Sequence, residues 1–121
     1  MDYSKLNGYM IELTETDGRL TIHLRAQRIG ADWSVAIFGG DTPHIGAIAL
    51  ACPDGSCQVI CLPNHREAEI AKHSALSLAT SFGANISVSC GIHLDDITKK
   101  EIELVTEAAE KVLGAFEKML S

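Results

Sequence analysis

The sequence has no cluster of positive charge. Ten Lys and Arg residues stand against sixteen Asp and Glu, which gives a net charge of −6, and the longest basic run is the pair Lys99–Lys100. Binding to a nucleic-acid backbone depends on clustered Lys and Arg side chains. We therefore expect no nucleic-acid partner.

Long hydrophobic runs are also absent. No apolar stretch approaches the ~20 residues that cross a membrane, and the first ten residues, MDYSKLNGYM, have no apolar segment behind a basic one. These features predict a cytoplasmic protein without a membrane partner. A length of 121 residues suits one domain, so we expect a single domain over residues 1–121.

Motifs for nucleophilic, nucleotide and zinc chemistry are missing. The sequence has no Gly-x-Ser-x-Gly, Walker or Gly-x-Gly-x-x-Gly motif, and its four cysteines form no Cys-x-x-Cys pair. Free Cys is among the most buried residue types, so we expect reduced thiols, with Cys61 and Cys90 pointing into the core. Cys52 and Cys57 flank the turn at residues 53–56, where we expect an open pair because the cytosol is reducing.

The first half of the chain carries regularly spaced turn residues at 17–18, 30–32, 39–43 and 53–56. Between these turns the sequence predicts an antiparallel meander. Its five strands are expected at residues 9–15, 19–28, 33–38, 44–52 and 57–62.

The fourth of these segments, HIGAIALAC at 44–52, is apolar on both faces, which predicts a strand covered on both sides. Its alanines, Ala47, Ala49 and Ala51, form a shallow face. We expect this face to permit close approach of a helix or of a second subunit.

The second half of the chain changes its hydrophobic period. Asn64 and Glu67 form a capping signature, helical spacing follows to Phe82, and Gly83 ends the run. Alternation over residues 86–92 predicts a sixth strand, and the capping box Thr98-Lys-Lys-Glu101 opens a long second helix. The order is therefore βββββαβα. We expect an α+β fold with a mostly antiparallel sheet of about six strands and two helices on one face.

Alternating strand directions bring several motifs to one edge of the predicted sheet. The strands at 33–38, 57–62 and 86–92 all end there, and both helices begin there. Helix N-termini attract anions because their first N–H groups are unpaired. We expect a phosphate or carboxylate site at this edge. Its candidate binding residues are Gly39, Gly40, His44, His65, Arg66 and His93.

The three histidines in this set leave a second hypothesis open. Together with Asp95 or Asp96, they would suit Zn²⁺ or Fe²⁺, or a general base, in a small metal- or histidine-dependent enzyme using His44, His65 and His93. Strong metal sites usually place two ligands on one short element, as in His-x-x-x-His, and this sequence does not. We therefore favour a site without metal ligands or catalytic residues.

Three other residues are expected to be structural. His23 lies on the polar face of the second strand and His73 on the outer face of the first helix, so both are expected to be solvated. Trp33 begins the third strand and is expected to be a core or interface aromatic.

Three segments resemble a family of small bacterial and archaeal proteins. They are residues 44–51 (HIGAIALA), 63–69 (PNHREAE) and 91–101 (GIHLDDITKKE), in that order. The family is the prenylated-flavin chaperone-like group, named for the D subunit of gallate decarboxylase. It is similar in fold to eukaryotic proteasome assembly chaperones, and the resemblance covers the chain from about residue 9 to the last helix.

The second motif of this family often has the form Gly-His-Lys-Glu. His65 and Glu67 match it, Arg66 keeps the charge, and Asn64 departs from it by placing a capping side chain where glycine stands. His44 and His93 match the first and third motifs.

The resemblance implies a non-catalytic accessory protein. Such a protein would help a flavin-dependent aromatic acid decarboxylase to acquire or retain prenylated flavin mononucleotide (FMN), so the implied cofactor is prenylated FMN or FMN. The flavin phosphate would lie at the start of the first helix, beside Arg66. One Trp, two Tyr and three Phe provide little stacking surface, which favours a transient or partner-shared site.

Two further expectations concern partners. The polar face of the second strand and the apolar fourth strand leave more surface than two helices cover, so we expect a homodimer. The partner protein would be a decarboxylase subunit. A chaperone that assembles its partner without binding any ligand is a further alternative, because fold alone does not fix function.

Overall fold

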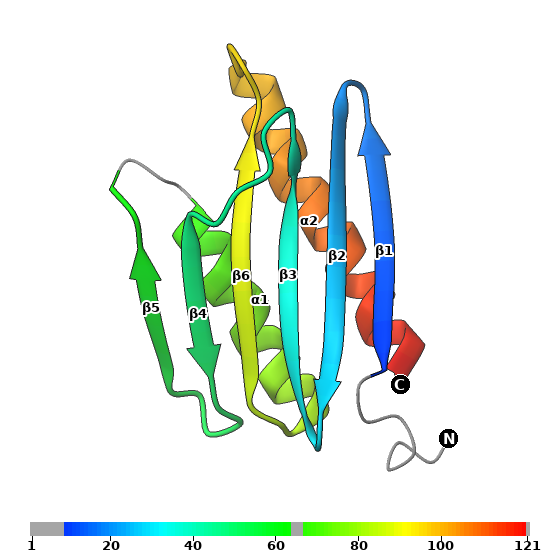
Figure 1. Ribbon diagram of the computed structural model, residues 1–121, viewed down its shortest axis with the longest axis vertical. Helices are drawn as coiled ribbons and strands as arrows, with labels where there is room; N and C mark the ends of the chain where they lie inside the picture. Colours follow the sequence, from blue (N-terminus) through cyan, green and yellow to red (C-terminus); the bar gives the residue numbers. More distant parts are fainter. Residues whose placement is uncertain (1–8, 64–66, 121) are drawn as a thin grey trace.

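The computed structural model describes residues 9–63 and 67–120 (Figure 1). Six strands and two helices follow in the order βββββαβα, which confirms the predicted α+β class. The strands are β1 (Met10–Asp17), β2 (Leu20–Ile29), β3 (Asp32–Gly40), β4 (Ala47–Ala51), β5 (Cys57–Cys61) and β6 (Ile86–His93). The helices are α1 (Glu67–Phe82) and α2 (Lys99–Leu120).

The sheet has the order β1-β2-β3-β6-β4-β5, and only β3 and β6 are parallel neighbours. The predicted strand directions are confirmed, but the continuous meander is wrong. β6 lies between β3 and β4, so these two strands do not pair. The six residues at 41–46 span this gap, and Ile86 and Val88 are fully buried at the centre of the sheet.

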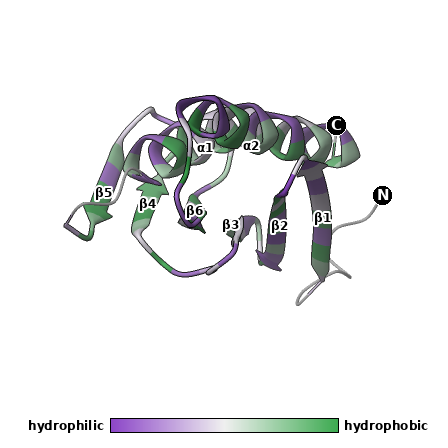
Figure 2. Cartoon of the chain, turned by 90° about the horizontal axis from the view of Figure 1, so that it is seen from above, coloured by the Kyte–Doolittle hydropathy of each residue, from purple (hydrophilic) through white to green (hydrophobic). Residues whose placement is uncertain are grey.

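Both helices pack on one face of the sheet, as predicted (Figure 2). Helix α1 contacts β4 and β6, and α2 contacts β1 and β2. Ala49 on β4 and Ala71 and Ala75 on α1 have no exposed surface, so the alanine face of β4 does receive a helix. Trp33 is a core residue, and its ring meets Phe116 edge to face at 5.3 Å.

The other face of the sheet is open. Ile48 and Leu50 on β4 are 42% and 50% exposed, and Ile60 on β5 is 74% exposed. The expectation that the fourth strand is covered on both sides is therefore wrong for one copy of the chain. The physical reason is that both helices pack on the same face.

The cysteines differ in burial because only some strands lie under a helix. Cys90 on β6 is buried, as predicted. Cys61 is exposed, which corrects its predicted place in the core, because β5 is an edge strand. Cys52 and Cys57 are not bonded to each other.

Neither helix in the described ranges is long and apolar enough to cross a bilayer.

Candidate functional site

A cleft of about 900 Å³ lies where β6 ends and both helices begin. Aliphatic side chains form most of its wall, and two histidines, two glutamates and a threonine supply its polar groups. The described lining residues are His44, Pro63, Glu67, Glu69, Ile70, Ile92, His93, Leu94, Ile97, Ile102, Val105 and Thr106. The cleft therefore combines an apolar interior with a few polar groups, as ligand sites do.

His44 is placed by the close approach of its backbone to β6. A Cβ atom on Gly91 would lie 1.7 Å from the His44 carbonyl oxygen, so only glycine fits there. The His44 ring contacts two acceptor oxygens. Nδ1 lies 3.1 Å from the Thr42 carbonyl oxygen, and Nε2 lies 3.0 Å from Oε1 of Glu67. Both ring nitrogens of His44 therefore face acceptor oxygens.

Glu67 is the first residue of α1 and is only 7% exposed. Its Oε1 also accepts the Ile92 backbone N–H, at 3.3 Å. A carboxylate at a helix N-terminus is favourable, because it faces the positive end of the dipole. Glu67 thereby ties α1, the end of β6 and His44 together.

Cys90 is close to this network but is not a nucleophile. Burial and, to a lesser extent, the charge of Glu67 raise the pKa of its thiol to about 12. The thiolate is the reactive form of cysteine, and at neutral pH this thiol stays protonated.

His93 also lines the cleft and is held mainly through backbone contacts. The Asp41 N–H donates to the His93 carbonyl oxygen at 2.7 Å, and the His93 Nε2 lies 3.1 Å from Oδ1 of Asp95. A Cβ on Gly40 would lie 2.1 Å from the same carbonyl oxygen, and Gly40 has a φ of +80°. Glycine is therefore needed at position 40 to bring the two backbones together.

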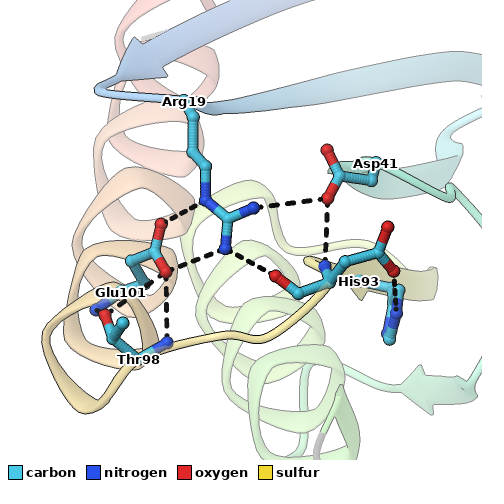
Figure 3. Close-up of polar contacts among 6 residues, drawn as sticks. Arg19, Asp41, His93, Thr98 and Glu101 are labelled. Carbon is cyan, nitrogen blue, oxygen red and sulfur yellow. Dashed lines mark hydrogen bonds and ion pairs between the residues drawn. The ribbon is translucent and has the colours of Figure 1, made fainter.

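A network centred on Arg19 fixes the segment between β6 and α2 (Figure 3). The Arg19 guanidinium donates from Nε to Oε2 of Glu101 at 2.6 Å, from Nη2 to Oε1 at 3.0 Å, and from Nη2 to the Asp95 carbonyl at 2.7 Å. Its Nη1 lies 3.5 Å from Oδ2 of Asp41. Residues from the β1–β2 turn, the β3–β4 connection, the β6–α2 segment and α2 thus converge beside the cleft.

The predicted capping box at the start of α2 is part of this network and is confirmed. The Glu101 N–H donates to Thr98 Oγ1, and the Thr98 N–H donates to Oε1 of Glu101, both at 3.1 Å. The bond from Arg19 and the Thr98 N–H together lower the pKa of Glu101 to about 2. Sequence reasoning missed Arg19, since no local pattern links it to a residue so distant in the chain.

The predicted site residues fall into three groups. His44 and His93 line the cleft. Gly39 and Gly40 do not line it and serve close backbone contacts, since a Cβ on Gly39 would lie 2.1 Å from the Thr21 carbonyl oxygen. The predicted positions 65 and 66 lie outside the described residues.

The charges of the cleft bear on both predicted ligands. Among its described lining residues there is no Lys or Arg, and Glu67 and Glu69 are acidic. A flavin phosphate there would depend on Arg66, which lies outside the described residues. Within residues 9–63 and 67–120, no group of three or more His, Cys, Asp or Glu residues is arranged to hold a metal ion.

The other two histidines lie away from the cleft. His73 is exposed, as expected, with Nε2 at 2.8 Å from Oε1 of Glu110. His23 is half-buried instead of fully solvated, because its ring stacks on Phe38 at 5.3 Å and its Nδ1 lies 3.1 Å from Oγ1 of Thr14.

The fold is similar to that of a proteasome assembly chaperone. A chain in the crystal structure of a chaperone complex for yeast 20S proteasome assembly matches with a TM-score of 0.62. The match covers 93% of this chain and 98% of that chain, at 14% sequence identity. Such a low identity shows the shared fold alone.

The family is shown by the sequence. The family model described as the prenylated flavin chaperone LpdD-like domain matches residues 16–121, and the chain belongs to this family. The protein LpdD of Lactiplantibacillus plantarum is 26% identical over 81 residues. That match spans 63% of this chain and 60% of the relative. Residues 16–121 thus form an LpdD-like chaperone domain.

Proposed function

We propose that this protein is a non-catalytic chaperone that carries prenylated FMN to, or retains it on, a flavin-dependent aromatic acid decarboxylase in the cytoplasm. The observation that carries the proposal is the aliphatic cleft of about 900 Å³, in a chain of the LpdD-like family. This volume is ample for one flavin. The decarboxylase would supply the catalytic groups.

The cleft suits the apolar part of the cofactor better than its phosphate. Side chains such as Ile92, Ile97 and Ile102 would contact the prenyl group and the ring system. The carboxylates of Glu67 and Glu69 would repel a phosphate, which points it toward Arg66 or toward the decarboxylase. Binding of one flavin by both the chaperone and the decarboxylase favours transfer of the flavin over its storage.

The chemistry of the described side chains supports a non-catalytic role. Cys90 is held as a buried thiol, and the imidazoles of His44 and His93 already contact the carboxylates of Glu67 and Asp95. The His44 ring therefore serves to join the β3–β4 connection to α1. A histidine-based enzyme would instead need one of these rings to release its partner and contact a substrate.

A second candidate is an assembly chaperone that binds no flavin. The acidic lining of the cleft favours it, since no described lining residue offers a cation to a phosphate. In that case a partner's apolar segment, and not a cofactor, would enter the cleft.

A binding titration separates these functions. FMN and prenylated FMN are titrated into the wild type, Ile97→Glu and Ile45→Glu. Both isoleucines are exposed, but only Ile97 lines the cleft. We expect prenylated FMN to bind more tightly than FMN, and Ile97→Glu to weaken it about tenfold or more because a carboxylate is desolvated against the ligand. Ile45→Glu should bind as the wild type does.

Other outcomes of the titration would refute the flavin site. Equal affinity in both variants would place the flavin outside the cleft. No binding of either flavin would favour the ligand-free chaperone, and tight metal in the purified protein would favour the enzyme. Arg66→Ala tests the phosphate separately, with an expected loss of one to two decades in affinity from removing a charge-assisted hydrogen bond of about 1.5–3 kcal/mol.

We also infer that the protein is a homodimer. The exposed side chains of Ile48, Leu50 and Ile60 on the β4–β5 part of the sheet support this proposal. A monomeric mass by light scattering at micromolar concentration would refute it.

A further inference from the structure

β5 is an edge strand without the features that protect edges. It forms one end of the sheet and pairs with β4 alone among the other strands (Figure 1). Its sequence, CQVIC, has no charged residue and no proline. The opposite edge strand, β1, carries Glu12, Glu15 and Asp17. Natural edge strands usually carry charge or proline, which discourages pairing with another chain.

The backbone of β5 presents alternate residues to the outside. The Leu62 N–H donates to the Gly46 carbonyl at 2.8 Å, and the Cys52 N–H donates to the Ser56 carbonyl at 2.9 Å. In an antiparallel ladder every second residue bonds to the neighbouring strand, so the even-numbered residues of β5 face β4. Val59 at the centre of the strand therefore directs its N–H and C=O away from β4.

We infer that β5 pairs in antiparallel fashion with β5 of a second copy, about a two-fold axis at Val59. The inference rests on the proposed homodimer and names its interface. The strand is close to a palindrome, with cysteine at both ends and valine in the middle. In this register Val59 lies opposite Val59 of the partner subunit, and Cys57 lies opposite Cys61 of the partner subunit. A two-fold interface requires such self-complementarity.

Charge favours a second copy as the occupant. The chain carries a net charge of −6, so two copies repel each other over much of their surface. The uncharged β5 is a place where copies can meet without opposing carboxylates on the paired strands. Pairing there would also place Ile60 of the two copies diagonally across the two-fold axis on the open face, where each would partly cover the other.

A proline substitution tests the pairing. Val59→Pro removes an N–H that β4 does not use, so the fold should persist. Thr14→Pro is the matched control on the other edge, because the Arg28 N–H donates to the Tyr9 carbonyl at 3.0 Å and Thr14 therefore faces away from β2. By light scattering with circular dichroism, we expect Val59→Pro to be a folded monomer at concentrations where the wild type and Thr14→Pro are dimers.

Disulfide trapping tests the register even if Val59→Pro fails to fold. In a Cys52→Ser background, diamide takes two electrons and two protons from each pair of thiols that it joins. Proteins carrying Cys57→Ser or Cys61→Ser should each remain uncrosslinked alone, and a mixture of the two should give a covalent dimer.

The outcomes distinguish the interface from the dimer. A monomeric wild type overturns the proposed homodimer and the β5 pairing with it. A dimeric wild type with an equally dimeric, folded Val59→Pro overturns only the pairing. A mixture that crosslinks no more than either variant alone overturns the register.

Discussion

Replacing Gly91 with alanine should destabilise the protein by moving the segment that carries His44. The new Cβ would lie 1.7 Å from the His44 carbonyl oxygen and 2.3 Å from its carbonyl carbon, whereas real Cβ contacts stay above 3.0 Å. The segment would therefore have to move by about 1.3 Å. That shift would stretch the 2.9 Å hydrogen bond from the Gly46 N–H to the Cys90 carbonyl and pull His44 from Glu67.

The size of the effect follows from these contacts. Overpacking costs about 1–3 kcal/mol, and weakening one backbone hydrogen bond adds about 1 kcal/mol, so we expect a loss of about 2–4 kcal/mol in the free energy of unfolding. For a domain of this size that loss lowers Tm by about 6–16 °C. Thermal unfolding followed by circular dichroism measures it.

Gly114 provides a control with the same chemical change and the opposite sign. It lies inside α2, and a Cβ there meets nothing within 4 Å. Gly114→Ala should therefore stabilise the protein by about 0.5–1 kcal/mol, since alanine is the better helix former. A Gly91→Ala protein that melts within about 2 °C of the wild type would show that residues 44–46 move without loss of stability. That result would refute the predicted clash.

Two further predictions concern α2. Glu101→Gln should matter less as the pH falls. The pKa of the Glu101 carboxyl is held at about 2 in the fold, chiefly by Arg19, so its contribution to the free energy of unfolding is present above the ordinary pKa of about 4.3 and is lost between about pH 4.5 and 2. Acid unfolding of both proteins tests this, and a difference in stability that stays constant with pH would contradict it. Phe116→Ala should cost about 3–5 kcal/mol in urea unfolding, because the buried ring packs on Trp33, whereas the exposed Met119→Ala should change stability by less than about 0.5 kcal/mol.

Local signals in the sequence were sufficient to predict the helices and strands. The capping box of Thr98 and Glu101 is made by residues three apart, so its pattern and its geometry coincide. α1 begins at Glu67, within the predicted cap, whose Asn64 lies outside the described residues. Alternation in β2 likewise separates the buried Ile22 and Leu24 from their outward neighbours.

Contacts between distant segments were not predictable in the same way. β3 and β4 run in opposite directions, so alternation alone is satisfied whether or not β6 lies between them. The exposure of Cys61 depends on where α1 lies, which the pattern of β5 does not record. In the cleft, His44 and His93 were predicted from the strand directions, but the aliphatic wall contributed by Ile70 and Ile102 depends on the packing of two helices.

The central position of β6 has a consequence for folding. Trp33 on β3 pairs with Ile86 of β6, and Ala51 on β4 also pairs with Ile86. The last strand in the sequence therefore joins the two halves of the sheet. Before it docks, β3 and β4 each have a bare inner edge, and their opposite directions allow them to form a non-native hairpin with each other. The sheet therefore completes at its middle, which raises the contact order and slows folding relative to a simple meander of the same length.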